Sequence, residues 1–404
     1  MKNWEKIKLV DLCEFVRGPF GGSLKKNIFK ADGYAVYEQQ HAIYNQFENI
    51  RYFIDENKFN EMKRFELKSG DLIMSCSGTM GKIAIVPDNI KKGIINQALL
   101  KLTPSPEKIS TVFLKLWMQS EGFQESLKKY SGGAAIQNVA SVSILKQIEI
   151  PLPPLPEQQR IVAILDEAFA AIANAQANAE QNLKNAKELF DVYLHKFYTS
   201  KEEGCEDKKL KEIAEYFNGL TYSPKDVSNE GIIVLRSSNV QNDELDFKDI
   251  VKVNLKVKEK IIVKDGDILM CSRNGSARLV GKTATIKNLN EEMTFGTFMM
   301  IIRSEYNQYL SWFFKSTDFR NQIKGGENTM INQITRYMLD DVVLSFPPIE
   351  KQIEIVKKLD SLSIEIKKLE AVYQQKINDL EELKKSVLQK AFNGELKTEK
   401  ISVE

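Results

Sequence analysis

Four short blocks of this sequence occur twice, in the same order along the chain. The blocks and their second copies are KLVDLCEFVRG (8–18) and KLKEIAEYFNG (209–219), GDLIM (70–74) and GDILM (266–270), GKIAIV (81–86) and GKTATI (281–286), and PPLPEQQRIVAILD (153–166) and PPIEKQIEIVKKLD (347–360). The offset of about 194 to 201 residues is far longer than the unit of a solenoid, which is roughly 20–50 residues. The sequence therefore predicts two copies of one whole domain. Two similar surfaces related by an approximate two-fold axis suit a target with two-fold character, such as duplex DNA.

The length and composition are those of a globular protein with several domains. A chain of 404 residues has room for two to four domains. Hydrophobic residues make up 43% and charged residues 28%, which is usual for a soluble protein. No apolar run reaches the roughly 18 residues that span a bilayer, and MKNWEKIKLV lacks the core of a signal peptide. These features predict a cytoplasmic protein without a membrane segment.

Cysteine and histidine usage argues against metal chemistry and histidine catalysis. The four cysteines have no CxxC spacing, and Cys76 and Cys271 occur in corresponding apolar segments. We therefore expect buried thiols rather than disulfides or a metal site. The chain has only two histidines, His41 and His195. The net charge of +2 is small for a protein that binds DNA alone, which suggests that partner subunits supply part of the contacts to phosphate.

Globular and helical segments alternate along the chain. We predict an α+β fold with globular domains at 1–150 and 201–345, helical segments at 151–200 and 346–396, and a tail at 397–404. Apolar runs such as DLIMSC, KIAIV and ALLKL predict strands, and glycine-rich turns separate them. Each domain also has one predicted amphipathic helix, near 110–129 and near 307–323. The residues predicted to face the core are Phe113, Leu116, Trp117 and Phe123 in the first, and Tyr309, Trp312, Phe313 and Phe319 in the second.

The two helical segments carry heptad repeats. The prolines of IPLPPLPEQQ exclude a helix before Pro156, and nothing interrupts the helix from there to about Tyr198. Heptads predict coiled-coil packing, and each helix is too long to pack on its own globule. We therefore expect the two helices to pair antiparallel, as a spacer between two globules with pseudo-two-fold symmetry; a helix pair that only dimerises the protein is the alternative. The heptad positions are Leu165, Ile172, Ala179, Ala186 and Tyr193, with Phe169, Leu183, Phe190 and Phe197 beside them, and Leu359, Ile366, Tyr373, Leu380 and Val387, with Leu362, Leu369 and Leu383 beside them.

The motifs of common enzymes are missing or incomplete. The stretch GSARLVGKT at 275–283 has one residue too many for a phosphate-binding loop. PLPPL and SFPPI lack the acidic or amide residue and the aromatic residue of the amino-methyltransferase motif (D/N)PP(Y/F). Neither GxGxxG nor GxSxG occurs. The sequence thus favours a protein without catalytic activity. A self-contained DNA methyltransferase or nuclease, and a coiled-coil adaptor that never touches DNA, are the competing hypotheses.

Polar loops at corresponding places of the two copies are the candidates for DNA contact. Arginine can pair with guanine, and asparagine or glutamine with adenine. The framework blocks match between the copies, whereas these loops differ, as two readers of two different sequences would require. The candidates in the first copy are Tyr37, Gln39, Gln40, His41, Ser77, Thr79, Lys82, Gln137 and Asn138. Those in the second copy are Arg236, Ser237, Ser238, Asn239, Arg273, Asn274, Ser276, Arg278, Lys282, Asn332, Gln333 and Arg336.

The chain resembles the specificity subunit of Type I restriction–modification systems. The resemblance rests on GDLIM and GDILM, each followed by a Gly-Lys turn, on IPLPPLPEQQRIV and its copy LSFPPIEKQIEIV, and on LQKAFNGEL at 388–396. It covers about residues 5–396. One departure is Lys351, which stands where the first copy has Glu157. Another is LHKFYTSKE at 194–202, which matches the closing motif only loosely.

This resemblance implies two target recognition domains, each of which reads one half of a bipartite site in double-stranded DNA. It also implies that the helices dock two methyltransferase subunits, through surfaces that include the 158–164 and 352–358 segments. Those partners would bind S-adenosylmethionine, and restriction and translocase subunits that use ATP and Mg²⁺ would join them. The chain itself would then need no cofactor and no metal.

Overall fold

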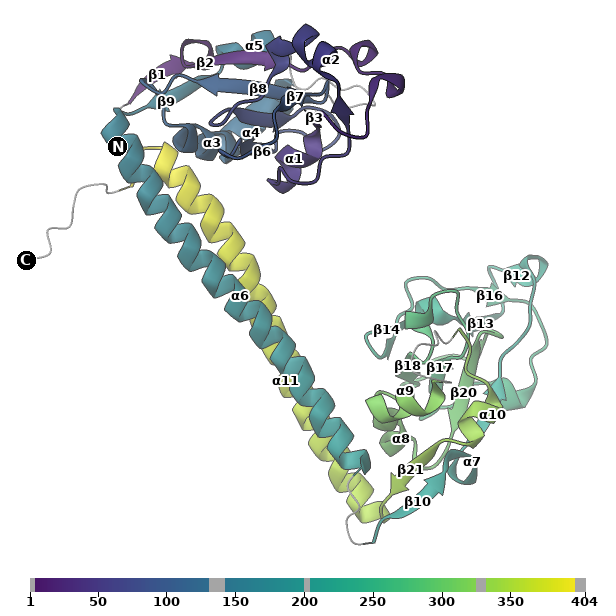
Figure 1. Cartoon of the computed structure of the whole chain (residues 1–404). Helices are drawn as coiled ribbons and strands as arrows, with labels where there is room; N and C mark the ends of the chain where they lie inside the picture. The colour runs from purple at the N-terminus through teal and green to yellow at the C-terminus, as the bar shows by residue number, and fades with distance from the viewer. Residues whose placement is uncertain (1–3, 131–141, 200–203, 325–331, 397–404) are drawn as a thin grey trace, which may run out of the picture. The chain divides into compact units, whose positions relative to one another are not determined.

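The computed structural model describes residues 4–130, 142–199, 204–324 and 332–396, and the chain divides into two compact units. Unit 1 comprises residues 1–179 and 375–404, and unit 2 comprises residues 180–374. Each unit contains one globule and parts of two long helices (Figure 1). The predicted boundaries between globular and helical domains stay a prediction. None of the described helices combines the length and apolar character that a membrane span needs.

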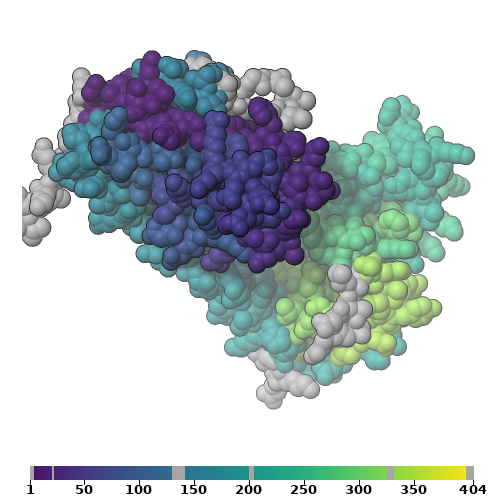
Figure 2. Space-filling model, turned by 45° about the horizontal axis from the view of Figure 1, so that its top comes forward, coloured from purple at the N-terminus to yellow at the C-terminus, as the bar shows by residue number. Residues whose placement is uncertain are grey.

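The globule of unit 1 is built on an antiparallel sheet of four strands in the order β2-β8-β5-β6. A smaller sheet, β4-β3-β7, has one parallel pair, and β1 pairs with β9, so that both ends of the globule meet. Figure 2 shows this globule from another side, in purple and blue. Its strands are β1 (Glu5–Lys8), β2 (Cys13–Arg17), β3 (Tyr34–Tyr37), β4 (Phe53–Ile54), β5 (Leu72–Ser75), β6 (Ile83–Ile85), β7 (Gly93–Ile95), β8 (Leu99–Pro104) and β9 (Glu149–Leu152), and its short helices are α1 (Gln39–Tyr44), α2 (Glu56–Glu61), α3 (Thr111–Gln119), α4 (Glu121–Tyr130) and α5 (Val142–Gln147).

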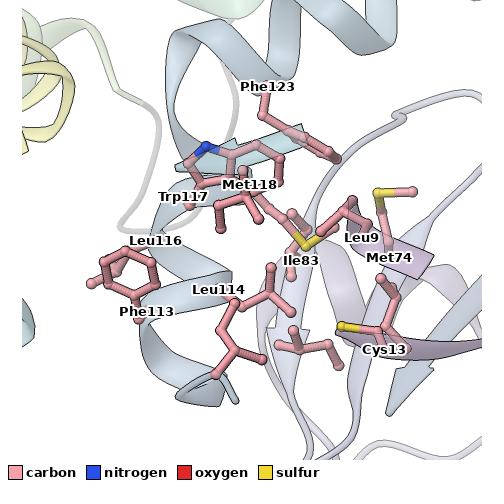
Figure 3. Packing of buried hydrophobic residues seen from close by; sticks show 14 of the residues in the cluster. Leu9, Cys13, Met74, Ile83, Phe113, Leu114, Leu116, Trp117, Met118 and Phe123 are labelled. Atoms are coloured by element: carbon pink, nitrogen blue, oxygen red, sulfur yellow. The ribbon is translucent and has the colours of Figure 1, made fainter. Parts of the chain in front are cut away.

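The repeated block GDLIM forms β5, which is buried on both faces. Successive side chains of a strand point to opposite faces, so Leu72 and Met74 join the core under α3, while Ile73 joins a second core with Tyr37. Figure 3 shows the first of these cores, where side chains of α3 such as Met118 lie against the sheet. The doubly buried strand explains why the block is apolar at consecutive positions.

The globule of unit 2 repeats the topology of the main sheet and has additional strands in its second sheet and in the pair β14-β15. Its main sheet has the order β11-β20-β17-β18, and a second sheet, β12-β16-β13-β19, again has one parallel pair, while β10 pairs with β21. The predicted duplication is thereby confirmed at the level of the fold. The strands are β10 (Glu206–Lys209), β11 (Glu215–Asn218), β12 (Val227–Ser228), β13 (Ile232–Leu235), β14 (Val240–Gln241), β15 (Glu244–Leu245), β16 (Lys252–Val253), β17 (Ile268–Cys271), β18 (Thr283–Thr285), β19 (Met293–Phe295), β20 (Met299–Arg303) and β21 (Val343–Phe346), and the short helices are α7 (Leu210–Ile213), α8 (Asn307–Phe313), α9 (Thr317–Ile323) and α10 (Arg336–Asp340).

A serine divides the amphipathic helix of each globule, so the prediction of one continuous helix is wrong in both copies. Ser120 separates α3 from α4, and Ser316 separates α8 from α9; both have extended backbones. Each hydroxyl donates a hydrogen bond of 2.6 Å to a carbonyl three residues earlier. The next helix then begins in a new direction, because serine can cap a helix start. The residues predicted to face the core are nevertheless buried in both helix pairs.

The two long helices, α6 (Leu155–Thr199) and α11 (Ile349–Phe392), run antiparallel in each unit. In unit 1, Leu165 near the start of α6 shares a core with Leu388 near the end of α11. In unit 2, Leu194 near the end of α6 shares a core with Leu359 near the start of α11. Both helices also pack on the globules through these cores, so the helices and one face of the main sheet of a unit share a hydrophobic core.

The heptad prediction holds over most of α6 and α11 and is wrong at Tyr193, Leu369 and Leu383. Leu165, Ile172, Ala179 and Ala186 are buried, whereas Tyr193 is exposed and its neighbour Leu194 is buried instead. The buried position shifts by one residue because this end of α6 packs on the globule. A straight helix has 3.6 residues per turn, so its buried face departs from a strict seven-residue repeat. In α11, Leu359 and Ile366 are buried, whereas the neighbouring row is exposed at Leu369 and Leu383. These two leucines therefore do not serve the helix pair as predicted.

Candidate nucleic-acid interface

Backbone hydrogen bonds bring three loops of unit 2 together beside the main sheet. The loops are residues 272–274 after β17, residues 296–298 before β20 and residues 332–335 before α10. The amides of Ser272 and Arg273 donate to the carbonyl of Phe298 at 3.0 and 3.1 Å. The Ile334 amide donates to the Ser272 carbonyl at 2.7 Å, and the Asn274 amide to the Asn332 carbonyl at 3.3 Å. The loops thus form one surface whose backbone is fixed by its own hydrogen bonds.

This surface contains a groove of about 690 Å³ that gathers three of the predicted residues, Arg273, Gln333 and Arg336. It also contains two exposed aromatic side chains that the sequence did not single out. Phe298 is 55% exposed and Tyr337 is 84% exposed. The Arg273 guanidinium lies 5.7 Å from the centre of the Phe298 ring. Such an arrangement offers both hydrogen-bond donors and apolar surface to one ligand.

The arginines of unit 2 divide into two groups by their partners. Arg236 pairs with Asp249 at 2.7 Å, and Arg303 pairs with Asp267 at 2.6 Å. Within the part of the chain that the structure describes, Arg273, Arg278 and Arg336 form no ion pair. Their donors are therefore open to an external acceptor such as a base edge or a phosphate.

Other predicted residues beside this surface serve the globule itself. The Asn274 side chain donates to the Ser237 hydroxyl at 3.2 Å and accepts from the Ser276 amide at 3.0 Å, which stabilises the turn. The half-buried Lys282 ammonium donates to the Val240 carbonyl at 2.8 Å. Ser238 is half-buried next to these residues. Ser276 remains exposed at the tip of the turn.

Asn239 does not reach the surface, which corrects its prediction as a DNA contact. Its side chain is buried and accepts a hydrogen bond from the Arg236 amide at 2.9 Å. It also donates to the carbonyls of Asp246 and Asp249, both at 2.9 Å. An asparagine that satisfies three backbone groups in the interior stabilises a loop and is not free to bind a base.

Tyr37 and His41 of unit 1 are corrected in the same way. Both side chains are fully buried, and their rings meet edge to face at 5.1 Å. The Tyr37 hydroxyl donates to the Lys91 carbonyl at 2.5 Å, and burial raises the pKa of Tyr37 to about 12. His41 Nδ1 accepts a hydrogen bond of 2.9 Å from the Glu38 amide, and burial lowers the pKa of His41. The two residues are core residues of the smaller sheet.

The remaining candidates of unit 1 lie on exposed or half-buried loops. Gln39 is half-buried, and the Gln40 side chain donates to the Asn49 carbonyl at 3.2 Å. In the turn after β5, the Ser75 hydroxyl donates to the Thr79 carbonyl at 2.6 Å and accepts from the Lys82 amide at 3.0 Å. These bonds hold Ser77 half-buried and leave Thr79 and Lys82 exposed. The predicted residues Gln137 and Asn138 lie outside the described residues.

Three features that bear on the competing enzyme hypotheses can be compared with the described residues. A phosphate-binding loop joins a strand to a helix, whereas 275–283 leads through a short 3₁₀ turn into strand β18. Burial raises the pKa of the Cys76 thiol to about 11, so this cysteine is protonated at neutral pH and is a poor nucleophile. In the four described ranges, no three His, Cys, Asp or Glu side chains cluster as metal ligands would.

Comparison with known proteins gives matches along both copies. A family model described as the Type I restriction modification DNA specificity domain matches residues 1–185 and again residues 202–382. The EcoKI specificity subunit of Escherichia coli K12 is 31% identical over 208 residues, which cover 49% of this chain and 44% of that protein. The putative MjaX specificity subunit of Methanocaldococcus jannaschii is 25% identical over 426 residues, which cover 98% of this chain and 94% of that protein.

Two solved structures share the fold at low sequence identity. The HsdS subunit from Thermoanaerobacter tengcongensis has a TM-score of 0.62 at 19% identity, over 98% of this chain and 97% of that chain. A chain from a study of complex assembly and conformational transition of the type I R-M system has a TM-score of 0.79 at 18% identity, over 98% of this chain and 99% of that chain.

Proposed function

Because this chain belongs to the Type I restriction–modification DNA specificity family, we propose that its two globules read the two halves of one bipartite DNA site. The observation that carries the proposal is the three-loop groove of unit 2. It combines arginines that lack ion pairs with exposed aromatic side chains, and the duplicated fold supplies a second globule with the same topology of the main sheet. In this assignment the chain is the sequence-specificity subunit and has no catalytic activity of its own.

The chemistry of the groove suits the edges of base pairs in the major groove. Arg273 and Arg336 can each donate two hydrogen bonds to guanine, and Gln333 can pair with adenine. Phe298 and Tyr337 can pack on the methyl group of thymine or on deoxyribose. The exposed residues Ser276, Arg278, Thr79 and Lys82 can contact phosphates, which position the protein without reading sequence.

We infer that the catalytic activities come from partner subunits. Two methyltransferase subunits would bring S-adenosylmethionine, and restriction subunits would bring ATP and Mg²⁺. The assembly would act on double-stranded DNA in the cytoplasm. The near-neutral charge of this chain supports shared contacts to phosphate. The exposed apolar residues of α11 in unit 2, which include Leu369 and Val372, provide a surface on which a methyltransferase subunit can bury apolar area.

Footprinting tests the proposal against its competitors. The chain with its methyltransferase subunits should protect two short patches of duplex DNA, separated by an unprotected gap. The purified chain alone should transfer no methyl group from S-adenosylmethionine. Methyl transfer by the chain alone would favour a self-contained enzyme, and the absence of any protection in the complex would favour an adaptor that does not bind DNA.

A further inference from the structure

Unit 1 has a groove at the end of its edge strand β2, and the groove partly overlaps the position that the three-loop groove has in unit 2. Its volume is about 660 Å³, and it lies between the end of β2, the residues that follow β2, the loop before β8 and helix α5. The sheet registers show where the two grooves overlap. Arg17 in β2 lies opposite Leu100 of β8, and Asn218 in β11 lies opposite Met300 of β20. Both residues line the grooves of their units.

A glycine directly after the edge strand allows a tight backbone crossing in both copies, and Gly18 lines the groove of unit 1. The first repeated block ends in Gly18 and in Gly219, directly after the two edge strands. A Cβ atom at Gly18 would lie 1.8 Å from the Asn96 carbonyl oxygen, and one at Gly219 would lie 2.2 Å from the Gly296 carbonyl oxygen. Only glycine permits this close approach of two backbones. The duplicated glycine therefore preserves the backbone crossing next to the edge strand, whereas the side chains around it are free to differ.

The side chains do differ, and they make the groove of unit 1 the more cationic of the two. At equivalent positions the first copy has Arg17, Gln97 and Lys146, and the second has Asn218, Thr297 and Asp340. Arg64 also lines the groove of unit 1. Arg64 forms no ion pair with a described residue, in contrast to Arg51, which pairs with Glu38 at 2.9 Å. Arg17 also forms no ion pair with a described residue, but its side chain interacts with the Cys76 thiol.

An exposed aromatic residue stands at the edge of this groove. Phe20 is 92% exposed, the highest value among the exposed large hydrophobic side chains of the described residues. It lines the groove with Arg17 and Arg64. A fully hydrated phenylalanine beside arginines without ion pairs has the composition of a binding surface, since aromatic residues and arginine dominate recognition surfaces.

We propose that this groove is the base-reading site of unit 1, with Phe20 and Arg64 as specificity-determining residues. As a candidate for DNA contact, this groove replaces the Tyr37–His41 segment, which is largely buried. Its ligand is the major-groove edge of duplex DNA: Arg64 donates to guanine, and Phe20 packs on the methyl group of thymine. The inference rests on the proposed function and adds to it the residues that read the half-site of the first copy.

The test uses the full chain in complex with its methyltransferase subunits and a library of duplexes with a randomised central segment. Wild type should select a bipartite motif. Phe20→Ala and Arg64→Ala should each relax preference at one or two positions of one half-site by about tenfold or more, and the other half-site should stay unchanged. The matched control is Tyr44→Ala, which truncates another exposed aromatic residue of unit 1, 73% exposed and outside the groove. It should select the wild-type motif.

The outcomes separate the two proposals. If wild type selects no bipartite motif, the proposed function fails. If wild type selects one and both groove variants select the same motif, the function stands and this inference is overturned. Relaxed base preference in both half-sites would also overturn this inference, because the groove of unit 1 would then not read a single half-site. Phe20 is solvent-exposed, so its truncation should leave the melting temperature of the chain unchanged, which excludes unfolding as the cause.

Discussion

The side-chain oxygen of Gln158, in the first turn of α6, accepts a hydrogen bond of 2.8 Å from the backbone amide of Ser110, just before α3. The Gln158 amide group donates to the carbonyls of Lys108 at 3.2 Å and Pro153 at 2.9 Å. The residue is fully buried. This glutamine of the repeated PPLPEQQ block thus fastens the long helix to the globule of unit 1. It is not part of an exposed partner surface, which corrects the expectation for the start of the 158–164 segment.

Gln352, the counterpart in the second copy, is held less completely. It is also buried, and its amide group donates to the Pro347 carbonyl at 2.8 Å. Its side-chain oxygen has no hydrogen-bond partner among the described residues. The start of the 352–358 segment is therefore interior too, and the same residue type makes more hydrogen bonds in the first copy than in the second.

Gln158→Leu should lower the free energy of unfolding by about 2–3 kcal/mol, since it leaves a backbone amide and two carbonyls without their partner. Gln352→Leu should cost about 1 kcal/mol, because it removes one hydrogen bond and also an unsatisfied buried oxygen. Urea unfolding followed by tryptophan fluorescence measures both. The control is Gln159→Leu at the exposed neighbouring position, which should stay within about 0.5 kcal/mol of wild type. Equal losses for the two buried glutamines would contradict the difference in hydrogen bonding.

Gly18→Ala should destabilise unit 1 by about 1–3 kcal/mol, because the new methyl group collides with the Asn96 carbonyl and forces the backbones apart. Gly122→Ala is the matched control. Gly122 lies inside α4, and nothing lies within 4 Å of its Cβ position. That substitution should raise stability by about 0.5–1 kcal/mol. The melting temperatures of the two variants should therefore shift in opposite directions. An unchanged melting temperature for Gly18→Ala would show that the backbones at Gly18 and Asn96 can separate without cost.

Apolar periodicity in the sequence predicted which helix residues are buried. Phe113, Trp117 and the central heptads of α6 are buried as expected, and the duplicated blocks predicted the shared topology. The helix breaks could not be predicted, because a serine is compatible with both a helix interior and a helix start, and packing decides between them. Heptads likewise do not reveal where a helix leaves its partner, as at Tyr193.

The candidate site was predicted less well, for a physical reason. Each groove collects residues from three or more separate segments, and their proximity depends on sheet register that a linear pattern does not contain. Polar residues directly after a strand were predicted to be exposed, yet His41 in α1 and Asn239 in the short turn after β13 fold back into the core and are buried. One signal was available for Phe298. It stands where the first copy has Ala98, directly before matching strands.

His41 should make the stability of unit 1 depend on pH. Its burial lowers its pKa below the usual 6.5, so the unfolded chain binds a proton at pH values where the folded chain does not. The contribution is fully present above about pH 6.5 and is lost as the pH falls through the lowered pKa. His41→Gln keeps an acceptor for the Glu38 amide and does not titrate. Between about pH 7.5 and about pH 5, wild type should lose more free energy of unfolding than this variant, as measured in urea at both pH values. Parallel losses would show that His41 is not responsible.

Arg273→Ala should change the preferred bases in one half-site only. Loss of an arginine that pairs with guanine costs about 1–3 kcal/mol of discrimination at that position. Arg236→Ala is the comparison, because the Arg236 guanidinium is already held by Asp249 at 2.7 Å and should contribute less to DNA. Selection from randomised duplexes by the complete complex measures both. A change in both half-sites would refute one reader per globule.

Leu369→Glu should weaken binding of a methyltransferase subunit without unfolding the chain. Leu369 is 42% exposed on α11, so a charge there should change the free energy of unfolding by no more than about 0.5 kcal/mol. In a buried interface the same carboxylate would lack a partner and cost several kcal/mol, roughly a hundredfold or more in affinity. Ser361→Glu places the same charge at an exposed polar position of the same helix and should leave affinity near wild type. Co-purification and titration of the methyltransferase subunit measure both variants. Equal affinity of the two would place the docking surface away from Leu369.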